Sequence, residues 1–395
     1  MKRCPLLLAL LAALVAAAPT AAAERTLPAK LARALAVPHV TPARTGAIAV
    51  DLATGELVFG RNAGLSLAPA STEKLTLSYA LLATVGPAYR LETQVLGAGE
   101  LDGATWRGDL ALKGFGDPTL RSGDLAALAQ RVRARGIGAI SGGVVADESY
   151  YDSRRTAPGW KASFYAQESA PLSALSVERT KARRPALVTA QLFSRALKAA
   201  GVTVGRPARE GRAPEDAELL ALDTSPPLLA ILREVNRDSD NFVAEMLLKH
   251  LGALELGKGT SRAGAAAVRE ALAEAGVPLA GVRIVDGSGL SRLDRLTADA
   301  LAALLLAAWR DPLLRGSFLS TLAVAGVNGT LEDRLERPPA RGNVYAKTGT
   351  TTAASALAGY VGGRYAFAVL TNGSPVAYWW CRRAQDRFVT ALATS

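Results

Sequence analysis

Two β-hairpin patterns, one near each end of the chain, constrain the fold more than any other feature of the sequence. Residues 46–60 (GAIAVDLATGELVFG) predict two short strands joined by a turn at 53–56. Residues 356–360 and 365–371 predict a second pair around Gly362-Gly363. Six helical patterns lie between the hairpins, at 75–84, 185–200, 226–235, 240–251, 261–275 and 297–309. We therefore expect a mixed α+β architecture, in which one sheet is closed by the first and last segments and flanked by helices.

Residues 90–184 follow a different pattern. Short β-like segments alternate there with turns and with one helix, at 92–96, 109–113, 143–147 and 123–136. This stretch predicts a smaller β-rich accessory domain inserted into the main domain. The main domain would then be discontinuous and consist of residues 24–89 and 185–395.

The scarcity of cysteine and histidine excludes several kinds of site. With two Cys and two His in 395 residues, the chain offers neither a disulfide scaffold nor a multi-Cys zinc or iron–sulfur site. His39 and His250 lie in no motif, so a Ser-His-Asp triad is not expected. We predict no metal and no cofactor, and hydrolytic chemistry would need a base other than histidine.

The chain carries a net charge of +11, and 36 of its 46 basic residues are Arg. Scattered basic charge favours an anionic partner, so we expect a weak association with an anionic membrane surface or cell-wall polymer. The basic residues do not gather into runs with interleaved aromatics. Nucleic acid is therefore not expected as a partner.

The N-terminus has the three parts of a secretory signal peptide. Lys2 and Arg3 precede an apolar run at 5–18, and Ala21-Ala22-Ala23 stand just before Glu24. Cleavage of the signal peptide, residues 1–23, would leave a net charge of +9 on a chain exported to the periplasm or cell envelope. The alternative, an uncleaved membrane anchor, fits less well because the apolar run is shorter than the ~20 residues that span a bilayer.

The first of three short motifs is Ser71-Thr72-Glu73-Lys74, at the start of an apolar helical pattern. Residues i and i+3 share a helix face, so the Lys74 amine can reach the Ser71 hydroxyl. A serine hydroxyl needs an adjacent base to attack at neutral pH, and a lysine with a lowered pKa can be that base. The alternative is a helix cap with a solvated lysine. Glu73 would point away from the pair, as a structural or solvated side chain.

The second and third motifs are Ser239-Asp240-Asn241 and Lys347-Thr348-Gly349. The second could relay a proton through Ser239 and hold a substrate amide through Asn241, and its alternative is an ordinary helix N-cap. In the third, glycine on a strand allows close backbone approach, and lysine with threonine can bind a carboxylate. Its alternative is a turn between strands.

In this order, the three motifs resemble the signature of the penicillin-recognising serine enzymes. Four flanking segments narrow the resemblance: GFGDPTL (114–120), PGW (158–160), SAPLSAL (169–175) and DGSGLSR (286–292). From about residue 42 to the C-terminus, the chain resembles the class C low-molecular-mass penicillin-binding proteins, the D-alanyl-D-alanine carboxypeptidases and endopeptidases of the DacB type. The resemblance implies the penicillin-binding-protein and serine β-lactamase-like transpeptidase fold, an antiparallel sheet of about five strands flanked by helices, here with one inserted β-rich domain. A second insertion that is usual in the family is missing.

The resemblance also implies catalytic roles for five residues. Ser71 would attack the carbonyl of the penultimate D-alanine of a peptidoglycan stem peptide, while Lys74 takes its proton. β-Lactam antibiotics would acylate the same serine. Ser239 with Lys347 would protonate the departing amine, and Asn241 would hold the substrate amide and the base.

Binding roles follow for the residues around the third motif. Thr348, Gly349 and Thr350 would contact the substrate, with Lys347 and Thr348 on its terminal carboxylate. The backbone N–H groups of Ser71 and Thr350 would form the oxyanion hole.

Acids and hydroxyls outside the three motifs carry weaker implications. Asp147 aligns with a family acid that meets the free amine of the stem-peptide side chain, and the alternative is an ordinary loop aspartate. Asp286, Ser288 and Ser291 would support the site from a loop, or form a Gly-rich turn.

Two other functions stay open at this point. A β-lactamase-like hydrolase shares the three motifs but needs a dedicated deacylating base, and the sequence shows none. A non-catalytic cell-wall binding protein could keep the same fold. Neither the balance of carboxypeptidase and endopeptidase cleavage nor the wall chemotype follows from the sequence.

Overall fold

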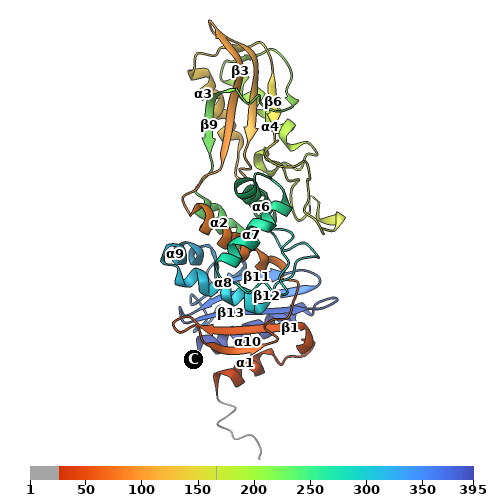
Figure 1. Ribbon diagram of the computed structural model, residues 1–395, viewed down its shortest axis with the longest axis vertical. Helices are drawn as coiled ribbons and strands as arrows, with labels where there is room; N and C mark the ends of the chain where they lie inside the picture. The colour runs from red at the N-terminus through yellow and green to blue at the C-terminus, as the bar shows by residue number, and fades with distance from the viewer. Residues whose placement is uncertain (1–25, 166) are drawn as a thin grey trace, which may run out of the picture.

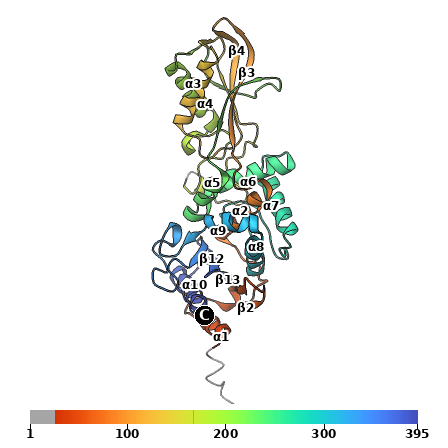
Figure 2. The ribbon, with the colours of Figure 1, turned by 90° about the vertical axis from the view of Figure 1, so that its left-hand side faces the viewer.

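The computed structural model describes residues 26–165 and 167–395, so the expected signal peptide at 1–23 lies outside the described residues. A sheet with its helices forms one end of an elongated molecule, and an inserted lobe forms the other (Figure 1, Figure 2). Helices α2 (Lys74–Val85), α6 (Asn241–Leu256) and α7 (Ser261–Glu274) lie between the two. In the described ranges, no helix is long and apolar enough to cross a membrane.

The larger sheet joins the two ends of the chain, as the hairpin patterns predict. Its six strands run in the order β10-β11-β12-β13-β1-β2, and every neighbouring pair is antiparallel. The prediction of about five strands is confirmed, and the sixth, β10, has only two residues. The bounds are β1 Thr45–Asp51, β2 Leu57–Arg61, β10 Ala323–Val324, β11 Val344–Thr350, β12 Ala354–Val361 and β13 Tyr365–Asn372.

Helices cover both faces of this sheet, so its central strands are buried on both sides. Along β1, Ile48 and Val50 pack on the face of α2 and α8, whereas Ala47 and Ala49 pack on the face of α1 and α10. This alternation is the period of two that a strand imposes on its side chains. The remaining covering helices are α1 Leu27–Leu35, α8 Ala298–Arg310, α9 Pro312–Thr321 and α10 Tyr378–Ala393.

The inserted lobe is a second sheet of seven strands with two helices packed on it. Its long strands β3, β4 and β9 are antiparallel, and its short strands add in parallel. Phe193 of α4 and Leu128 of α3 fill its core together with Val95 and Leu110 of the sheet. The bounds are β3 Glu92–Asp102, β4 Thr105–Gly114, α3 Ser122–Ala134, β5 Ala139–Ile140, β6 Val144–Asp147, α4 Pro185–Ala199, β7 Thr203–Val204, β8 Arg209–Glu210 and β9 Glu218–Thr224.

The predicted end of the inserted domain at residue 184 is wrong. Helix α4 buries its apolar face in the lobe, and β9 returns to pair with β3. The chain re-enters the main domain beside its exit point, where the Ser225 amide donates to the Leu91 carbonyl at 2.9 Å. The lobe therefore extends to Thr224, and the segment between β6 and α4 leaves it to pack on the main domain, where Tyr151 and Leu172 join the core. A helical pattern shows that one face is buried but not against which sheet, which is why the sequence assigned α4 to the wrong domain.

The other predicted helices are present, but one of them is only partly α-helical. The segment predicted at 226–235 forms α5 (Leu228–Arg233) and then a π-helical turn at Glu234–Asp238. Helices α1, α9 and α10 were not predicted. The N-terminal part of α10 carries YWWCRR instead of a clean apolar stripe, so its periodicity is weak in the sequence.

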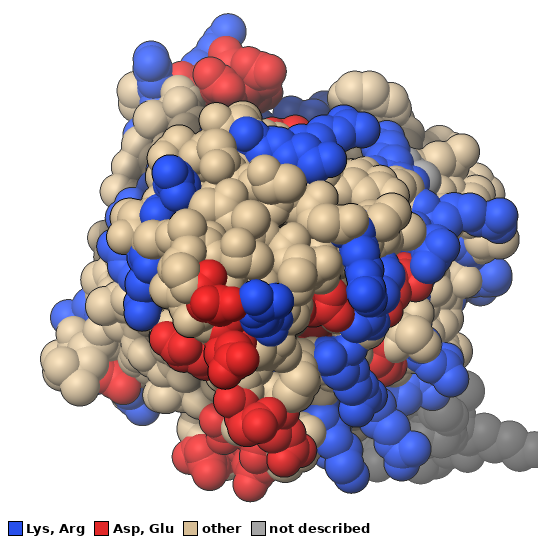
Figure 3. All heavy atoms as spheres, turned by 90° about the horizontal axis from the view of Figure 1, so that it is seen from above, with Lys and Arg blue, Asp and Glu red and all other residues tan. Residues whose placement is uncertain are grey.

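On the face seen from above, charged side chains of both signs are scattered. Figure 3, which looks down on the molecule from above, shows basic side chains spread between smaller groups of acidic ones. Several charges on the lobe pair with each other at the surface, including Arg209 with Asp109 at 2.8 Å. Exposed pairs of this kind contribute little to stability.

Candidate active site

The first motif forms a tight turn that presents its serine to its lysine. Ser71 lies in a 3-10 turn at Ala70–Glu73, and Lys74 is the first residue of α2. The Lys74 Nζ donates to the Ser71 Oγ at 3.0 Å, so the predicted pair is in contact. The solvated-lysine alternative is wrong, because the Lys74 side chain is completely buried.

Burial changes the acid–base chemistry of this lysine. It lowers the pKa of the Lys74 amine to about 8, although nearby carboxyl groups, first among them Asp286, act in the opposite direction. The Nζ also donates to the Asn241 Oδ1 at 2.8 Å and to the Ser288 carbonyl at 2.7 Å. The donation to Ser71 belongs to the protonated amine. Once neutral, the amine has two N–H groups for Asn241 and Ser288, and its lone pair can accept the proton of the Ser71 hydroxyl. This is the arrangement of a general base and its nucleophile.

The second motif follows the π-helical turn and opens α6. Ser239 has a left-handed backbone (φ 64°), and Asp240 caps the helix by accepting from the Val243 amide at 2.9 Å. The capping alternative is therefore correct for Asp240. It does not exclude the catalytic interpretation, because Asn241 contacts Lys74 and Ser239 lines the same cavity as Ser71.

The third motif lies on β11, beside the turn that carries Ser71. The fully buried Lys347 Nζ donates to the Thr348 carbonyl at 2.9 Å. Burial, followed by the charge of Lys74, holds the pKa of the Lys347 amine well below its usual value. A Cβ on Gly349 would lie 2.8 Å from the Pro69 carbonyl oxygen and 3.1 Å from the Ser71 amide nitrogen. Glycine therefore permits the close approach of strand and turn that the sequence predicts.

A cavity of about 260 Å³ brings the three motifs together. Ser71, Ser239, Thr348 and Thr350 all line it. Sequence reasoning missed its remaining lining, which comes from the segment before β11, from β12 and from the unpredicted helix α10: Thr330, Arg334, Ser355, Tyr378, Arg382 and Gln385. No local pattern marks these residues, because only the packing of α10 on the sheet brings them to the site.

The chain matches the D-Ala-D-Ala carboxypeptidase 3 (S13) family over residues 27–183 and 177–393. The chain belongs to this family. A D-alanyl-D-alanine carboxypeptidase of Actinomadura sp. (strain R39) is 32% identical to it, over 85% of this chain and 79% of the relative. The carboxypeptidase DacB of Mycolicibacterium smegmatis is also 32% identical, over 89% of this chain and 81% of the relative. Penicillin-binding protein 4 (DacB) of Haemophilus influenzae has the same fold, with a TM-score of 0.80 at 22% identity over 92% of this chain and 98% of that one.

In this S13 enzyme, a buried loop packs behind Lys74 and contacts its amine. The Asp286 carboxylate accepts from the amides of Gly289 and Ser291, each at 2.7 Å, and from the Trp160 Nε1 at 2.8 Å. The loop thereby presents the Ser288 carbonyl to Lys74. The supporting position predicted for this loop matches the structure.

Glu245 is a further member of this support that sequence reasoning missed. Its Oε1 accepts from the amides of Gly287 and Ser288 at 3.0 and 2.9 Å. It lies one turn after Asn241 on the same face of α6. Asn241 contacts Lys74 directly, whereas Glu245 fixes the loop whose Ser288 carbonyl contacts Lys74. Burial, and then the charge of Asp286, raises the pKa of the Glu245 carboxyl to about 8. The sequence did contain a signal for Glu245, because it lies four residues after Asn241 and therefore on the same face of the helix.

Glu73 and Asp147 are both buried, as the structural interpretation of Glu73 predicts. Glu73 is completely buried and accepts from the Thr76 hydroxyl at 2.9 Å, so its solvated alternative is wrong. Burial raises the pKa of this carboxyl well above its usual value. Asp147 is buried at the end of β6, and its two oxygens accept from the amides of Ser149 and Ala213 at 2.9 Å each. With both oxygens used inside the lobe, Asp147 is not placed to meet a substrate amine.

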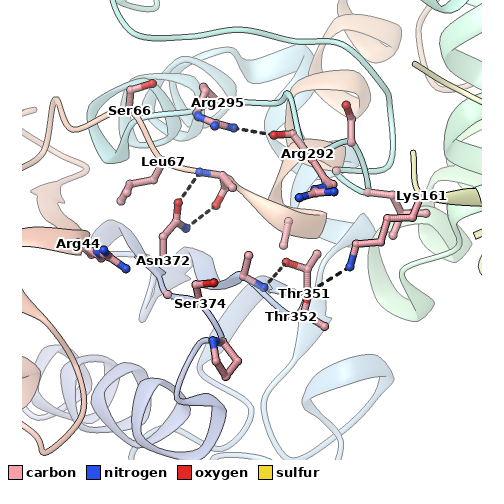
Figure 4. Close-up of a pocket in the computed structure, with 18 of the residues that line it drawn as sticks. Arg44, Ser66, Leu67, Lys161, Arg292, Arg295, Thr351, Thr352, Asn372 and Ser374 are labelled. Atoms are coloured by element: carbon pink, nitrogen blue, oxygen red, sulfur yellow. Dashed lines mark hydrogen bonds between the residues drawn. The ribbon is translucent and has the colours of Figure 1, made fainter. Parts of the chain in front are cut away.

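A larger cavity of about 710 Å³ lies beside the catalytic one (Figure 4). It begins at Ala70, next to Ser71, and passes Thr351 and Thr352 just beyond the end of β11. Its other side is formed by the loop that follows Ser288 and by Lys161. Space for a substrate therefore extends on two sides of Ser71.

Proposed function

We propose that this S13 enzyme is a serine-type D-Ala-D-Ala carboxypeptidase and endopeptidase that hydrolyses peptidoglycan stem peptides through an acyl-enzyme on Ser71. One observation carries the proposal: the buried Lys74 amine lies 3.0 Å from the Ser71 Oγ and is held there by Asn241. Family membership supports the same reaction class.

In the first step, Lys74 removes the Ser71 proton and the Oγ attacks the carbonyl carbon of the penultimate D-alanine. The negative oxygen that forms would face the backbone N–H groups of Ser71 and Thr350. The fit of Gly349 against the Ser71 amide supports this assignment, because it brings the end of β11 to the nucleophile. Loss of one such donor raises the barrier of acyl transfer by ~2.7–4 kcal/mol in other enzymes.

In the second step, the bond between the carbonyl carbon and the amide nitrogen breaks. The nitrogen leaves with a proton delivered through Ser239, which Lys347 and the protonated Lys74 would assist. Thr348 and Lys347 would meanwhile hold the carboxylate of the leaving group. Arg334 adds positive charge to the same cavity and is fixed by Asp386 at 2.6 Å and Gln385 at 2.8 Å. Water then hydrolyses the ester and restores Ser71.

The proposal extends to β-lactams and to location. A β-lactam places a strained amide and a carboxylate in the same relation as the D-Ala-D-Ala terminus, so it would acylate Ser71. The signal pattern at 1–23 supports export to the periplasm or cell envelope. The net charge supports a weak association with anionic membrane or wall polymer, which salt would reverse.

The decisive experiment is intact-mass spectrometry of the purified mature protein after incubation with benzylpenicillin. We expect one penicilloyl adduct, its absence from Ser71→Ala, and its retention in Ser122→Ala, an exposed serine of the lobe. Rapid turnover of a chromogenic cephalosporin without a stable adduct would favour the β-lactamase alternative. Absence of any adduct on a folded protein would overturn the proposal in favour of a non-catalytic wall binder.

A further inference from the structure

One face of helix α10 lines the catalytic cavity and leads from its interior to the protein surface. Tyr378, Arg382 and Gln385 all contribute to the lining of this cavity. They follow one another at spacings of four and three residues, so they lie on the same side of the helix. Gln385 is 1% exposed, whereas Tyr378 at the start of the helix is 36% exposed. The helix face therefore has an inner end inside the cavity and an outer end at the surface.

The inner end is a fixed network of hydrogen bonds. Gln385 accepts from the Arg334 guanidinium at 2.8 Å and donates to the Ser355 hydroxyl at 3.0 Å. Asp386 holds the same guanidinium at 2.6 Å. This end offers one positioned guanidinium in the cavity that also contains Thr348. It suits a small charged group such as the carboxylate of the leaving residue.

The outer end is aromatic and carries a charge without a counter-ion. Trp379 is 73% exposed, and its ring meets the Tyr378 ring edge to face, with centroids 5.0 Å apart. Arg382 donates only to neutral oxygens, the Tyr378 hydroxyl at 3.4 Å and the Asp333 carbonyl at 3.2 Å. In residues 26–165 and 167–395, Arg382 forms no ion pair. Trp, Tyr and Arg are the side chains that most often supply binding energy at contact surfaces.

The packing of α10 does not account for the exposure of Trp379. The next residue, Trp380, turns the other way, packs against the core and lies with its ring centroid 5.7 Å from that of His39. A single exposed apolar side chain on a protein surface needs no explanation. Trp379, however, adjoins Tyr378 and Arg382 at the outer end of a cavity that contains the nucleophile. Its position therefore indicates contact with a ligand that extends out of this cavity.

We propose that Tyr378, Trp379 and Arg382 bind the leaving half of a peptidoglycan cross-link, so that the enzyme releases a peptide-bearing amine in preference to free D-alanine. The inference rests on the proposed function, because it assumes that the leaving group occupies the cavity beside Thr348. Free D-alanine has only a methyl side chain and ends inside the cavity. A leaving residue whose side chain continues into a second stem peptide would pass over the two rings. Arg382 would then donate to the carbonyl or carboxylate oxygens of that peptide.

Three synthetic substrates that differ only in the leaving residue test the preference. They share one acyl part and end in a D-residue with a free carboxylate: D-alanine, D-norleucine, or D-lysine whose side-chain amine carries a tripeptide. We expect kcat/KM to be about 10–100-fold higher for the tripeptide-bearing substrate than for the D-alanine substrate, with D-norleucine close to D-alanine. Equal values, or a preference for D-alanine, would overturn the inference. A D-norleucine value equal to that of the tripeptide substrate would also overturn it, because an apolar side chain would then suffice.

Variants assign the preference to the outer end of α10. Trp379→Ala and Arg382→Gln should each reduce the advantage of the tripeptide substrate about tenfold. Trp380→Ala and Arg383→Gln are the matched controls, because these neighbours contact His39 and each other instead of the cavity. Both controls should keep the advantage, measured per folded molecule. An unchanged advantage in either of the first two variants would contradict the assignment.

Binding to Ser71→Ala separates this inference from the proposed reaction. The probes are the two products, free D-alanine and free D-lysine that carries the tripeptide, and calorimetry measures their affinities. Binding of the peptide product at least tenfold tighter than D-alanine, and its weakening by Trp379→Ala, supports the inference even if the wild-type protein cleaves no substrate. Equal binding, or no binding of either product, overturns the inference even if the wild-type protein cleaves all three. If the N-acetylglucosamine tetrasaccharide of chitin displaces the peptide product, the aromatic pair serves a glycan strand instead, and the inference fails.

Discussion

The catalytic domain and the inserted lobe use charge in opposite ways. Around the motifs, Lys74, Lys347, Glu245 and Asp286 all have 0% exposure. The core cluster of the lobe is apolar, and its buried Asp147 is hydrogen-bonded only to backbone amides. Ion pairs of the lobe lie at the surface, as in the pair of Arg107 with Asp102, whose side chains are 62% and 58% exposed. Burying a charged group costs free energy of folding, so a cluster of buried charged groups indicates a functional site.

The comparison predicts that the two regions respond differently to substitution. Changes among the buried charges should alter acylation far more than folding. Changes in the core of the lobe should alter folding far more than acylation. Rates of benzylpenicillin acylation, measured per folded molecule, compare the two regions on one scale.

The largest effect on this scale is expected at the base. Lys74→Met should slow acylation about 10²–10⁴-fold, the range that general-base catalysis spans. Lys249 is the matched control, because it is a buried lysine outside the site that pairs with Asp152 at 2.6 Å. Lys249→Met should lower stability but keep the rate of the folded fraction, and equal losses in the two variants would break the comparison.

The pH dependence of the base has a defined sign. Burial holds the pKa of Lys74 at about 8, below its usual 10.5, so the neutral base accumulates and the acylation rate rises through about pH 8. Below that pH, the buried ammonium opposes folding, and this penalty fades as the pH approaches 10.5. Lys74→Met should therefore raise the melting temperature relative to wild type more at pH 6.5 than at pH 9.5. A wild-type rate that stays flat from pH 6 to 9 would contradict this assignment.

The next effect is expected where strand and turn meet. In Gly349→Ala the new Cβ would lie 2.8 Å from the Pro69 oxygen, so β11 must move away from Ser71. We expect acylation to slow about 100-fold, which is the loss caused by misplacing reacting atoms by about 1 Å and the lower end of the loss caused by removing one oxyanion donor. Gly123→Ala in α3 is the control, because nothing lies within 4 Å of its Cβ. A rate within twofold of wild type would show that the close approach is not needed.

Lys74 and Gly349 lie in motifs that the sequence shows directly, whereas other parts of the structure could not be predicted from it. The hairpins, most helices and the three motifs follow from local periodicity and spacing, and so does the contact of Ser71 with Lys74. The end of the lobe at Thr224 and the approach of α10 with Arg382 depend on long-range packing, which a single sequence does not encode in any local pattern. The substrate-binding role predicted for Asp147 does not fit the structure, because the resemblance matched an aspartate in the sequence but could not show which groups its oxygens contact.

A smaller effect is expected at the support behind the base. Glu245→Ala removes the acceptor of the Gly287 and Ser288 amides and should slow acylation about tenfold, because the Ser288 carbonyl is no longer fixed on Lys74. Glu245→Gln keeps a neutral acceptor and should stay within about threefold of wild type at pH 7, where the raised pKa of about 8 keeps the acid mostly protonated. Equal losses in both variants would mean that the negative charge of Glu245, and not its shape, is required.

The smallest effect on acylation is expected in the core of the lobe. Phe193 is completely buried there, so Phe193→Ala should lower the free energy of unfolding by about 3–5 kcal/mol. The lobe joins the main domain near Leu91 and Ser225, and its core shares no residue with the cavity around Ser71. The folded variant should therefore acylate within about twofold of wild type at a temperature well below its melting point, since distant sites act nearly independently. A tenfold loss of acylation rate in the folded variant would show that the lobe holds the catalytic groups in place. The two regions could then not be treated as independent.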